Sequence, residues 1–156
     1  MPRDERALRA SVERSAAILV GAGFPKMPAR VLMRLVVAEG AGMTAFELSE
    51  QLGASAAAIS GAVRYLQTVG MVRRVAQTGS RRDRYELPEH AWYAAFSKSS
   101  PMYLSLAVLA DQAAAAINDP SAPASIRLEE IARFYRFLDA RLPELMAEWD
   151  HLRRGE

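Results

Sequence analysis

The residues with the clearest chemical potential are arginines, and they are concentrated in one stretch of the chain. Residues 55–87 carry a net charge of +4, whereas residues 111–150, with eight acids and four arginines, carry −4. The charged residues of the basic stretch are Arg64, Arg73, Arg74, Arg81, Arg82 and Arg84, with Asp83 and Glu86. Guanidinium groups bind phosphate and carboxylate oxygens, so this distribution indicates that one segment meets a polyanion. A solvated arginine face would have the same composition, and charge alone leaves both interpretations open.

Patterns for catalysis or metal binding do not stand out in the sequence. The chain has no cysteine, which excludes disulfides, thiolate nucleophiles and zinc sites of the cysteine type. Its two histidines, His90 and His151, are far apart, and neither has a local ligand pattern. There is no recognisable acid–base pair or phosphate-binding glycine loop. The sequence therefore predicts a protein that is not an enzyme and needs neither a metal nor another cofactor.

The composition is that of a globular protein, with 51% hydrophobic and 24% charged residues. No stretch approaches the roughly 20 consecutive apolar residues of a membrane span. The first six residues begin a charged helix with no apolar signal core behind it. We therefore expect a cytoplasmic protein without a membrane partner.

Four helices are predicted in the first half of the chain. The first two span residues 2–20 and about 28–39, and a Gly-Ala-Gly sequence follows each of them. Thr44 and Glu47 have the capping-box pattern that starts a short third helix. Ser55 is expected to cap a fourth helix that lasts to about residue 69.

After the fourth helix the hydrophobic pattern changes to that of strands. Residues 71–77 and 84–87 are predicted strands, and the polar residues 78–83 between them form a hairpin tip. A structural role for Arg84 is open. Two short helices followed by a basic two-stranded ribbon are the order of elements in a winged helix-turn-helix, a fold that binds duplex DNA.

The fourth helix has one face suited to the major groove of DNA. Its apolar residues Ile59, Ala62, Val63 and Leu66 share the side expected to be buried. The opposite side carries small residues, one arginine and no acid, so it can sink into the groove and contact base edges or phosphate. An ordinary alanine-rich surface helix is the alternative. The residues expected to contact DNA from this part of the chain are Ser55, Ala56, Ala57, Ser60, Gly61, Arg64 and Thr68.

The hairpin tip supplies a second set of expected DNA contacts. Arg81 and Arg82 stand where a wing reaches a minor groove, and Asp83 is expected to orient one of them. Arg73 and Arg74 point to opposite faces of their strand, so we expect one of them, Arg73, to contact a phosphate. A solvated hairpin tip would also be basic, which remains an alternative for the wing.

The second half of the chain is predicted to be helical. Pro88 opens a helix to about residue 97, Pro101 restarts it, and residues 118–120 end it. Ser125 is expected to cap the last long helix.

Apolar residues of the last helix are spaced alternately three and four apart, which is the pattern of a helix–helix seam. Pro143 removes one hydrogen bond from this helix, so we expect a kink or a restart there. The seam is predicted to hold a second copy of the chain, and packing on the chain's own core is the alternative. The residues expected in the dimer interface are Leu128, Ile131, Tyr135, Leu138, Leu142, Leu145 and Trp149, with Leu8, Val12 and Leu19 of the first helix.

Several segments together resemble the MarR family of bacterial regulators, and its GbsR-like branch in particular. They are Leu48-Ser-Glu-Gln-Leu-Gly-Ala-Ser-Ala-Ala-Ala-Ile-Ser60, Arg64-Tyr-Leu, Val69-Gly-Met-Val72 and Gly79-Ser-Arg-Arg-Asp-Arg-Tyr85. The tail segment Arg127-Leu-Glu-Glu-Ile-Ala-Arg-Phe-Tyr-Arg-Phe-Leu138, followed by Pro143 and Trp149, is similar to the C-terminal helix of that branch. The resemblance covers about residues 10–150, although the wing lacks the usual Asp-x-Arg-Ser order.

The resemblance implies a homodimer held by N- and C-terminal helices and bound to a pseudo-palindromic operator in double-stranded DNA. Proteins of this family often bind small aromatic or amphipathic effectors in a cleft. The aromatic residues that flank the junction of wing and tail are Trp92, Tyr93, Phe96, Tyr103, Phe134 and Phe137. They are the candidates for effector binding, with core packing as the alternative for most of them.

The sequence thus predicts a mostly helical α+β chain in three parts. Residues 1–26 form an N-terminal dimerisation helix, residues 27–88 a winged helix-turn-helix, and residues 89–156 a C-terminal helical dimerisation region. The predicted function is a sequence-specific, duplex-DNA-binding transcriptional regulator that acts as a homodimeric repressor relieved by a small-molecule effector. The alternative is a winged helix that binds a protein partner and no DNA. The lack of acids on the exposed face of the fourth helix favours DNA.

Overall fold

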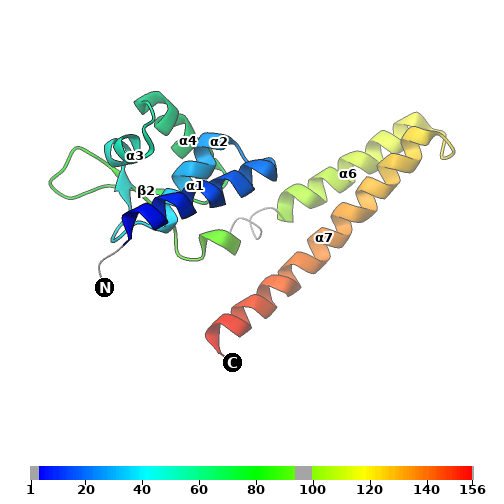
Figure 1. Ribbon diagram of the computed structural model, residues 1–156. Coiled ribbons are helices and arrows are strands. Elements are labelled where there is room, and N and C mark those ends of the chain that lie inside the picture. The colour runs from blue at the N-terminus through cyan, green and yellow to red at the C-terminus, as the bar shows by residue number, and fades with distance from the viewer. Residues whose placement is uncertain (1–3, 94–99, 156) are drawn as a thin grey trace. The chain divides into compact units, whose positions relative to one another are not determined.

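The computed structural model describes residues 4–93 and 100–155, which divide into two compact units, Met1–Ala91 and Trp92–Glu156 (Figure 1). The first unit contains α1 (Glu5–Gly21), α2 (Lys26–Val36), β1 (Met43–Thr44), α3 (Ala45–Leu52), α4 (Ala56–Thr68), β2 (Arg73–Val75) and β3 (Arg84–Glu86). The second contains α6 (Ser100–Ile117) and α7 (Pro123–Arg154). None of the helices within the described ranges is both long and apolar enough to cross a membrane. The fold is mostly helical with a small antiparallel sheet, as the sequence predicts.

The two helices of the helix-turn-helix begin at the predicted caps. The Thr44 hydroxyl accepts a hydrogen bond from the backbone N–H of Glu47, and the Glu47 carboxylate accepts one from the backbone N–H of Thr44, which completes the capping box. The Ser55 hydroxyl accepts from the backbone N–H of Ala58 over 3.2 Å. Gly53 ends α3 in the left-handed conformation, at φ 59°. These local contacts confirm both predicted helix starts.

The sheet has three strands in the order β1-β3-β2, all antiparallel. Tyr85 of the central strand pairs with Met43 on one side and with Arg74 on the other. The strands β2 and β3 are shorter than the predicted ranges 71–77 and 84–87. The strand β1 was not predicted, because two residues are too few to show an alternating pattern.

The core of unit 1 joins α2, α3 and α4 and includes Met43 of β1. Its largest fully buried side chains include Leu32, Leu48, Ile59 and Leu66, at most 1% exposed. Helix α1 packs on α2, and this contact includes a paired hydrogen bond from Arg30 to the Glu13 carboxylate. Arg30 also donates to the carbonyl of Leu52 at the end of α3 over 3.0 Å. This arginine therefore links three helices, and its bond to Glu13 raises the pKa of its guanidinium.

Unit 2 is a helical hairpin of α6 and α7 (Figure 1). The contact between the helices is built on the buried alanines Ala107, Ala110 and Ala132, whose small side chains let the helices approach closely. Tyr103 of α6 stacks on Tyr135 of α7, with 5.8 Å between the ring centroids. Because small residues fill this contact, most of the large apolar side chains of the two helices lie outside it.

The expected cap of α7 at Ser125 is wrong, and of the two outcomes expected at Pro143, a kink or a restart, the restart does not occur. Ser125 does not cap the helix: Ala122 is the N-cap and Pro123 occupies the first turn, where its fixed φ suits a helix start. Ser125 instead lies inside the helix and is 1% exposed. The helix also runs through Pro143 without a restart, since a proline removes one backbone bond and the bonds on either side maintain the helix.

Candidate nucleic-acid interface

The outer face of α4 has the composition and exposure of a groove-reading surface. The residues predicted to contact DNA there, Ser55, Ala56, Ala57, Ser60, Gly61, Arg64 and Thr68, are all exposed. The predicted inner residues Ile59, Ala62, Val63 and Leu66 are at most 2% exposed. The Thr68 hydroxyl donates to the carbonyl of Arg64 over 3.0 Å. A guanidinium nitrogen of Arg64 lies 3.4 Å from the Ser60 hydroxyl, a long contact that leaves the guanidinium accessible.

The strand arginines of the hairpin are engaged by acids of the same hairpin. Arg73 donates to Glu86, its partner across the strands, over 2.6 Å. Arg74 forms an ion pair with Asp83, and this contact raises the pKa of the Arg74 guanidinium. The expectation that Asp83 orients Arg81 or Arg82 is therefore wrong. The register of β2 against β3 brings Asp83 across the hairpin to Arg74, a contact that neighbourhood in the sequence does not reveal.

The tip arginines are exposed and differ in their surroundings. Within residues 4–93 and 100–155, Arg81 has neither a hydrogen bond nor an ion pair from its side chain. The guanidinium of Arg82 lies over the ring of Phe46, 5.3 Å from its centroid, in a cation–π contact. Phe46 stands in the first turn of α3 and is 58% exposed. Phe46 is not among the predicted DNA contacts, although an aromatic side chain in the first turn of a helix that begins with a capping box is a signal visible in the sequence.

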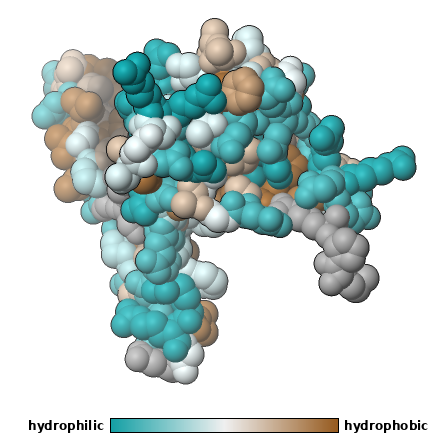
Figure 2. Space-filling model, turned by 90° about the vertical axis from the view of Figure 1, so that its left-hand side faces the viewer, coloured by the Kyte–Doolittle hydropathy of each residue, from teal (hydrophilic) through white to brown (hydrophobic). Residues whose placement is uncertain are grey.

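The structure thus separates two kinds of arginine in the basic stretch. Arg73, Arg74 and Arg84 face acids of the same unit. Arg64, Arg81 and Arg82 have no acidic partner within the part of the chain that the structure describes. Figure 2 looks onto the side of unit 1 that carries α3 and the hairpin, and hydrophilic side chains cover most of it. A polyanion is the partner that such uncompensated guanidinium groups favour.

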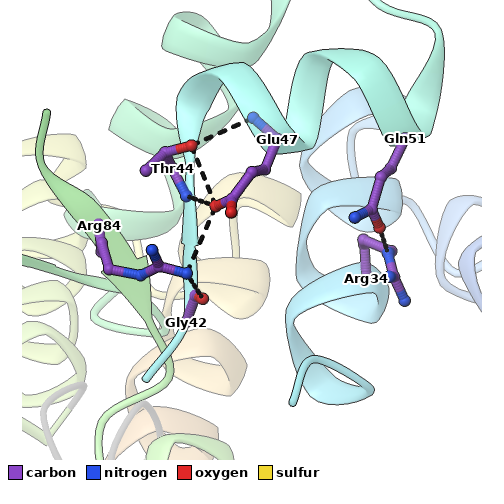
Figure 3. A network of polar contacts seen from close by, with 6 residues as sticks. All are labelled: Arg34, Gly42, Thr44, Glu47, Gln51 and Arg84. Atoms are coloured by element: carbon purple, nitrogen blue, oxygen red, sulfur yellow. Dashed lines mark hydrogen bonds and ion pairs between the residues drawn. The ribbon is translucent and has the colours of Figure 1, made fainter. Parts of the chain in front are cut away.

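Arg84 belongs to a polar network that joins the base of the hairpin to α3 (Figure 3). It donates to the carbonyl of Gly42 over 2.8 Å, and it lies 3.4 Å from the Glu47 carboxylate. The Glu47 carboxylate also accepts from the backbone N–H of Thr44, over 2.7 Å. Chiefly this bond, together with the Thr44 hydroxyl and Arg84, lowers the pKa of Glu47 against the opposing effect of burial. Arg84 therefore has a structural role.

Two sequence models of one family match the chain. Residues 22–83 match the MarR family, and residues 90–152 match the MmpR5-like MarR family transcriptional regulators. Each match covers less than half of the chain, which is therefore similar to MarR-family transcriptional regulators over both segments. Neither match names the GbsR-like branch.

A solved structure shares the fold of this chain. A crystal structure of a transcriptional regulator superimposes with a TM-score of 0.82 at 23% sequence identity, covering 93% of this chain and 99% of that one. A mutant of MepR from a multidrug-resistant S. aureus clinical isolate has a TM-score of 0.44 at 14% identity, covering 94% of each chain. The curated proteins contain no match.

The residues predicted for dimerisation fall into two groups. Ile131, Leu145 and Trp149 of α7 are between 42% and 55% exposed. Leu128 and Tyr135 pack against α6 of the same chain, and Leu138 and Leu142 are half-buried. In unit 1, Val12 is 3% exposed, Leu19 packs against the unit's own core, and Leu8 is half-buried.

The aromatic residues predicted for effector binding are also divided. Trp92 and Tyr93 line a hollow of about 410 Å³ with Leu145, Met146, Glu148, Trp149 and Leu152. Tyr93 and Trp149 meet edge to face there, with ring centroids 6.3 Å apart. Tyr103 stacks on Tyr135 away from this hollow, and Phe134 and Phe137 are exposed on α7. Phe96 lies outside the described residues.

Proposed function

We propose that this chain is a sequence-specific, duplex-DNA-binding transcriptional regulator that acts in the cytoplasm as a homodimeric repressor. One observation carries the proposal. The exposed face of α4 has no acid, and the hairpin that follows it holds Arg81 and Arg82 without acidic partners in the described part of the chain. The MarR-family matches over residues 22–83 and 90–152 support the same function.

In this proposal α4 is the recognition helix. Its small residues Ala57, Ser60 and Gly61 let the helix axis approach the floor of the major groove, where methyl and hydroxyl groups meet base edges. Arg64 is the long side chain on this face, and its guanidinium is free to contact a guanine edge with two hydrogen bonds. The N-terminal residues of α4, from Ser55 onward, are the part of a recognition helix that contacts bases.

The hairpin between β2 and β3 is the wing. Arg81 reaches a minor groove or its phosphates, where a narrow groove concentrates negative potential. Arg82 is the second wing arginine that contacts the DNA. In the free protein its guanidinium lies over the exposed ring of Phe46. Arg73 can reach a phosphate because its side chain is 62% exposed. This contact is weaker, because Glu86 already balances the charge of Arg73.

The dimer is held by residues 1–26 and 89–156, and residues 27–88 form the DNA-binding domain. The α6–α7 contact uses alanines and leaves Phe134, Phe137 and Leu145 each at least 55% exposed. Exposed apolar side chains on a hairpin of two helices favour an interface with a second copy of the chain. The resemblance of residues 127–138 supports a GbsR-like tail, whereas the family match over residues 90–152 is described as MmpR5-like.

A small apolar or amphipathic molecule in the hollow of unit 2 is the proposed effector that relieves repression. The volume of about 410 Å³ falls in the range of roughly 300–1,000 Å³ of ligand sites. Trp92, Tyr93 and Trp149 offer aromatic faces, and Glu148 offers one carboxylate. This combination fits a molecule with an aromatic or aliphatic body and a polar or cationic end.

DNA binding is tested by titrating the full chain with a long mixed-sequence duplex over a series of salt concentrations. We expect binding at low salt whose logarithmic affinity falls linearly with the logarithm of salt concentration, because phosphate contacts release counterions. A protein-binding winged helix would not bind the duplex even at low salt. That result would contradict the proposed function.

A further inference from the structure

The wing is attached to α3 through a residue that belongs to two elements at once. Thr44 is the N-cap of α3 and also the last residue of β1, where it pairs with Arg84 of β3. A change in the position of β3 therefore acts on the start of α3. The third and fourth helices share the core through Leu48 and Ile59, so the start of α3 is in turn fixed relative to α4.

Arg84 strengthens this attachment with its side chain. It extends from β3 across β1 and meets two acceptors, the carbonyl of Gly42 and the carboxylate of Glu47 (Figure 3). The Glu47 carboxylate accepts hydrogen bonds from both the backbone N–H and the hydroxyl of Thr44. One carboxylate thus holds the start of α3 and the first residue of the central strand together.

The close approach of the two strands allows this geometry. Gly42 has φ +79°, and a Cβ atom built on it would lie 2.1 Å from the carbonyl oxygen of Tyr85. The strand β3 therefore lies directly against the chain at Gly42. A second attachment exists nearer the tip, where Arg82 rests on Phe46 of α3. Both attachments of the hairpin lead to the same helix.

We propose that Arg84 and Glu47 are positioning residues for DNA binding: their contact holds the wing in the orientation in which Arg81 reaches the DNA. This inference rests on the proposed function. Neither side chain contacts DNA in this account, because Arg84 is directed to Gly42 and Glu47, and its side chain is 25% exposed. A variant without the contact between Arg84 and Glu47 still has the wing arginines, but the wing is no longer held in the orientation in which Arg81 reaches the DNA.

The variant Glu47→Gln gives a test in which charge and position predict opposite results. Glutamine retains an oxygen that accepts from the Thr44 backbone, so the cap of α3 persists. The variant also removes a negative charge from a DNA-binding domain, and electrostatics alone predict tighter binding. Glutamine is neutral, so the ion pair that attracts Arg84 is lost, and this loss predicts weaker binding and a salt slope reduced by about one unit, as for one lost phosphate contact.

The control is Glu50→Gln, which changes the charge of the same helix by the same amount. Glu50 is exposed, and within the described residues its side chain has no partner. We expect Glu50→Gln to bind a mixed-sequence duplex more tightly than the wild type and Glu47→Gln to bind it less tightly. If Glu47→Gln binds as tightly as Glu50→Gln, the inference is wrong.

A double-variant measurement separates positioning from a general loss of stability. In the wild type, Arg81→Ala should weaken DNA binding, and in the Glu47→Gln background the same change should weaken it by a smaller factor. Thermal unfolding of each variant establishes that it is folded. Arg84→Lys, which keeps the charge and reaches one acceptor, replaces Glu47→Gln if that variant unfolds, with the same expectation. Equal factors in both backgrounds would overturn the inference, and a wild type that binds no duplex would overturn the proposed function with it.

Discussion

The arginines of the basic stretch differ in availability because their acidic neighbours differ. Arg74 and Arg84 are held by Asp83 and Glu47, whereas Arg64 and Arg81 have no acid beside them in the described part of the chain. A phosphate must compete with an existing ion pair at the first two positions and meets a free guanidinium at the others. The net charge of the stretch therefore overstates the number of arginines that DNA can use.

The contrast between Arg81 and Arg74 is testable within one hairpin. We expect Arg81→Ala to weaken duplex binding and to lower the slope of log affinity against log salt by about one unit. Arg74→Ala should have a smaller effect, because Asp83 already balances that charge. Salt titrations of the two folded variants give both slopes. Equal losses would mean that the ion pair does not determine which arginine contacts DNA.

Arg64 is predicted to read a base rather than the backbone. We expect Arg64→Ala to cost roughly 1–3 kcal/mol of binding free energy and to relax the preference at one position in each half-site. A phosphate contact would instead weaken binding uniformly across sequences. Selection of duplexes by the wild type and the variant distinguishes the two roles. No loss of affinity would remove the exposed face of α4 from the interface.

Local signals and long-range pairing explain which elements the sequence predicts. The caps at Thr44 and Ser55 are local, since each hydroxyl contacts a residue three positions away, and both helix starts are confirmed. The strand β1 and the pair of Arg74 with Asp83 depend on which strands meet and in which register, and adjacent residues do not encode this. Ser125 has the local pattern of a helix cap, but the helix begins two residues earlier, at Pro123.

The junction of β1 and β3 should tolerate almost no added volume at Gly42. Gly40 and Gly42 both have positive φ, which strains any side-chain-bearing residue by roughly 1–2 kcal/mol. A Cβ at Gly42 would also collide with the Tyr85 carbonyl, whereas a Cβ at Gly40 meets nothing within 4 Å. We expect Gly42→Ala to destabilise the protein by about 2–5 kcal/mol and Gly40→Ala by the strain alone. Denaturant unfolding measures both, and equal losses would contradict the close approach.

Acid should weaken the link between α3 and the wing through Glu47. The hydrogen bonds from Thr44 and the nearby Arg84 lower the pKa of Glu47 in the folded protein. Stability from this carboxylate is therefore fully present above its unfolded pKa of about 4.3, and it is lost as the pH falls through the lower folded value. The difference in unfolding free energy between wild type and Glu47→Gln should be largest near neutral pH and shrink below about pH 4. A difference independent of pH would contradict this role.

At the scale of the whole molecule, the two units bury their apolar residues differently. Unit 1 has a continuous core around Leu32, Leu48 and Ile59. The core of unit 2 is a small alanine cluster, and large apolar side chains of α7 remain exposed. The sequence predicted an apolar seam on the last helix. It did not show that Leu128 and Tyr135 would pack on α6, because periodicity does not distinguish an internal partner from a second chain.

The proposed dimer depends on the exposed side chains of α7. Phe134 and Phe137 are 55% and 59% exposed, so glutamate at both positions should leave the hairpin folded and disrupt the interface, since buried charges without partners are unfavourable. We expect the double variant Phe134→Glu, Phe137→Glu to sediment as a folded monomer at concentrations where the wild type is a dimer. Arg133→Glu, an exposed charge change on the same helix, is the control. A wild-type monomer would contradict the dimer.

The most direct test of the central claim is selection of bound duplexes from a random-sequence pool by the full-length wild-type chain. A single recognition helix with one long base-reading side chain gives little discrimination, since one good pair of contacts contributes about 1–3 kcal/mol. Two copies related by a two-fold axis double these contacts and require half-sites about one helical turn apart. We expect enrichment of an inverted repeat with that spacing. Binding without any enriched sequence, or enrichment of a single unrepeated site by a monomer, would contradict it.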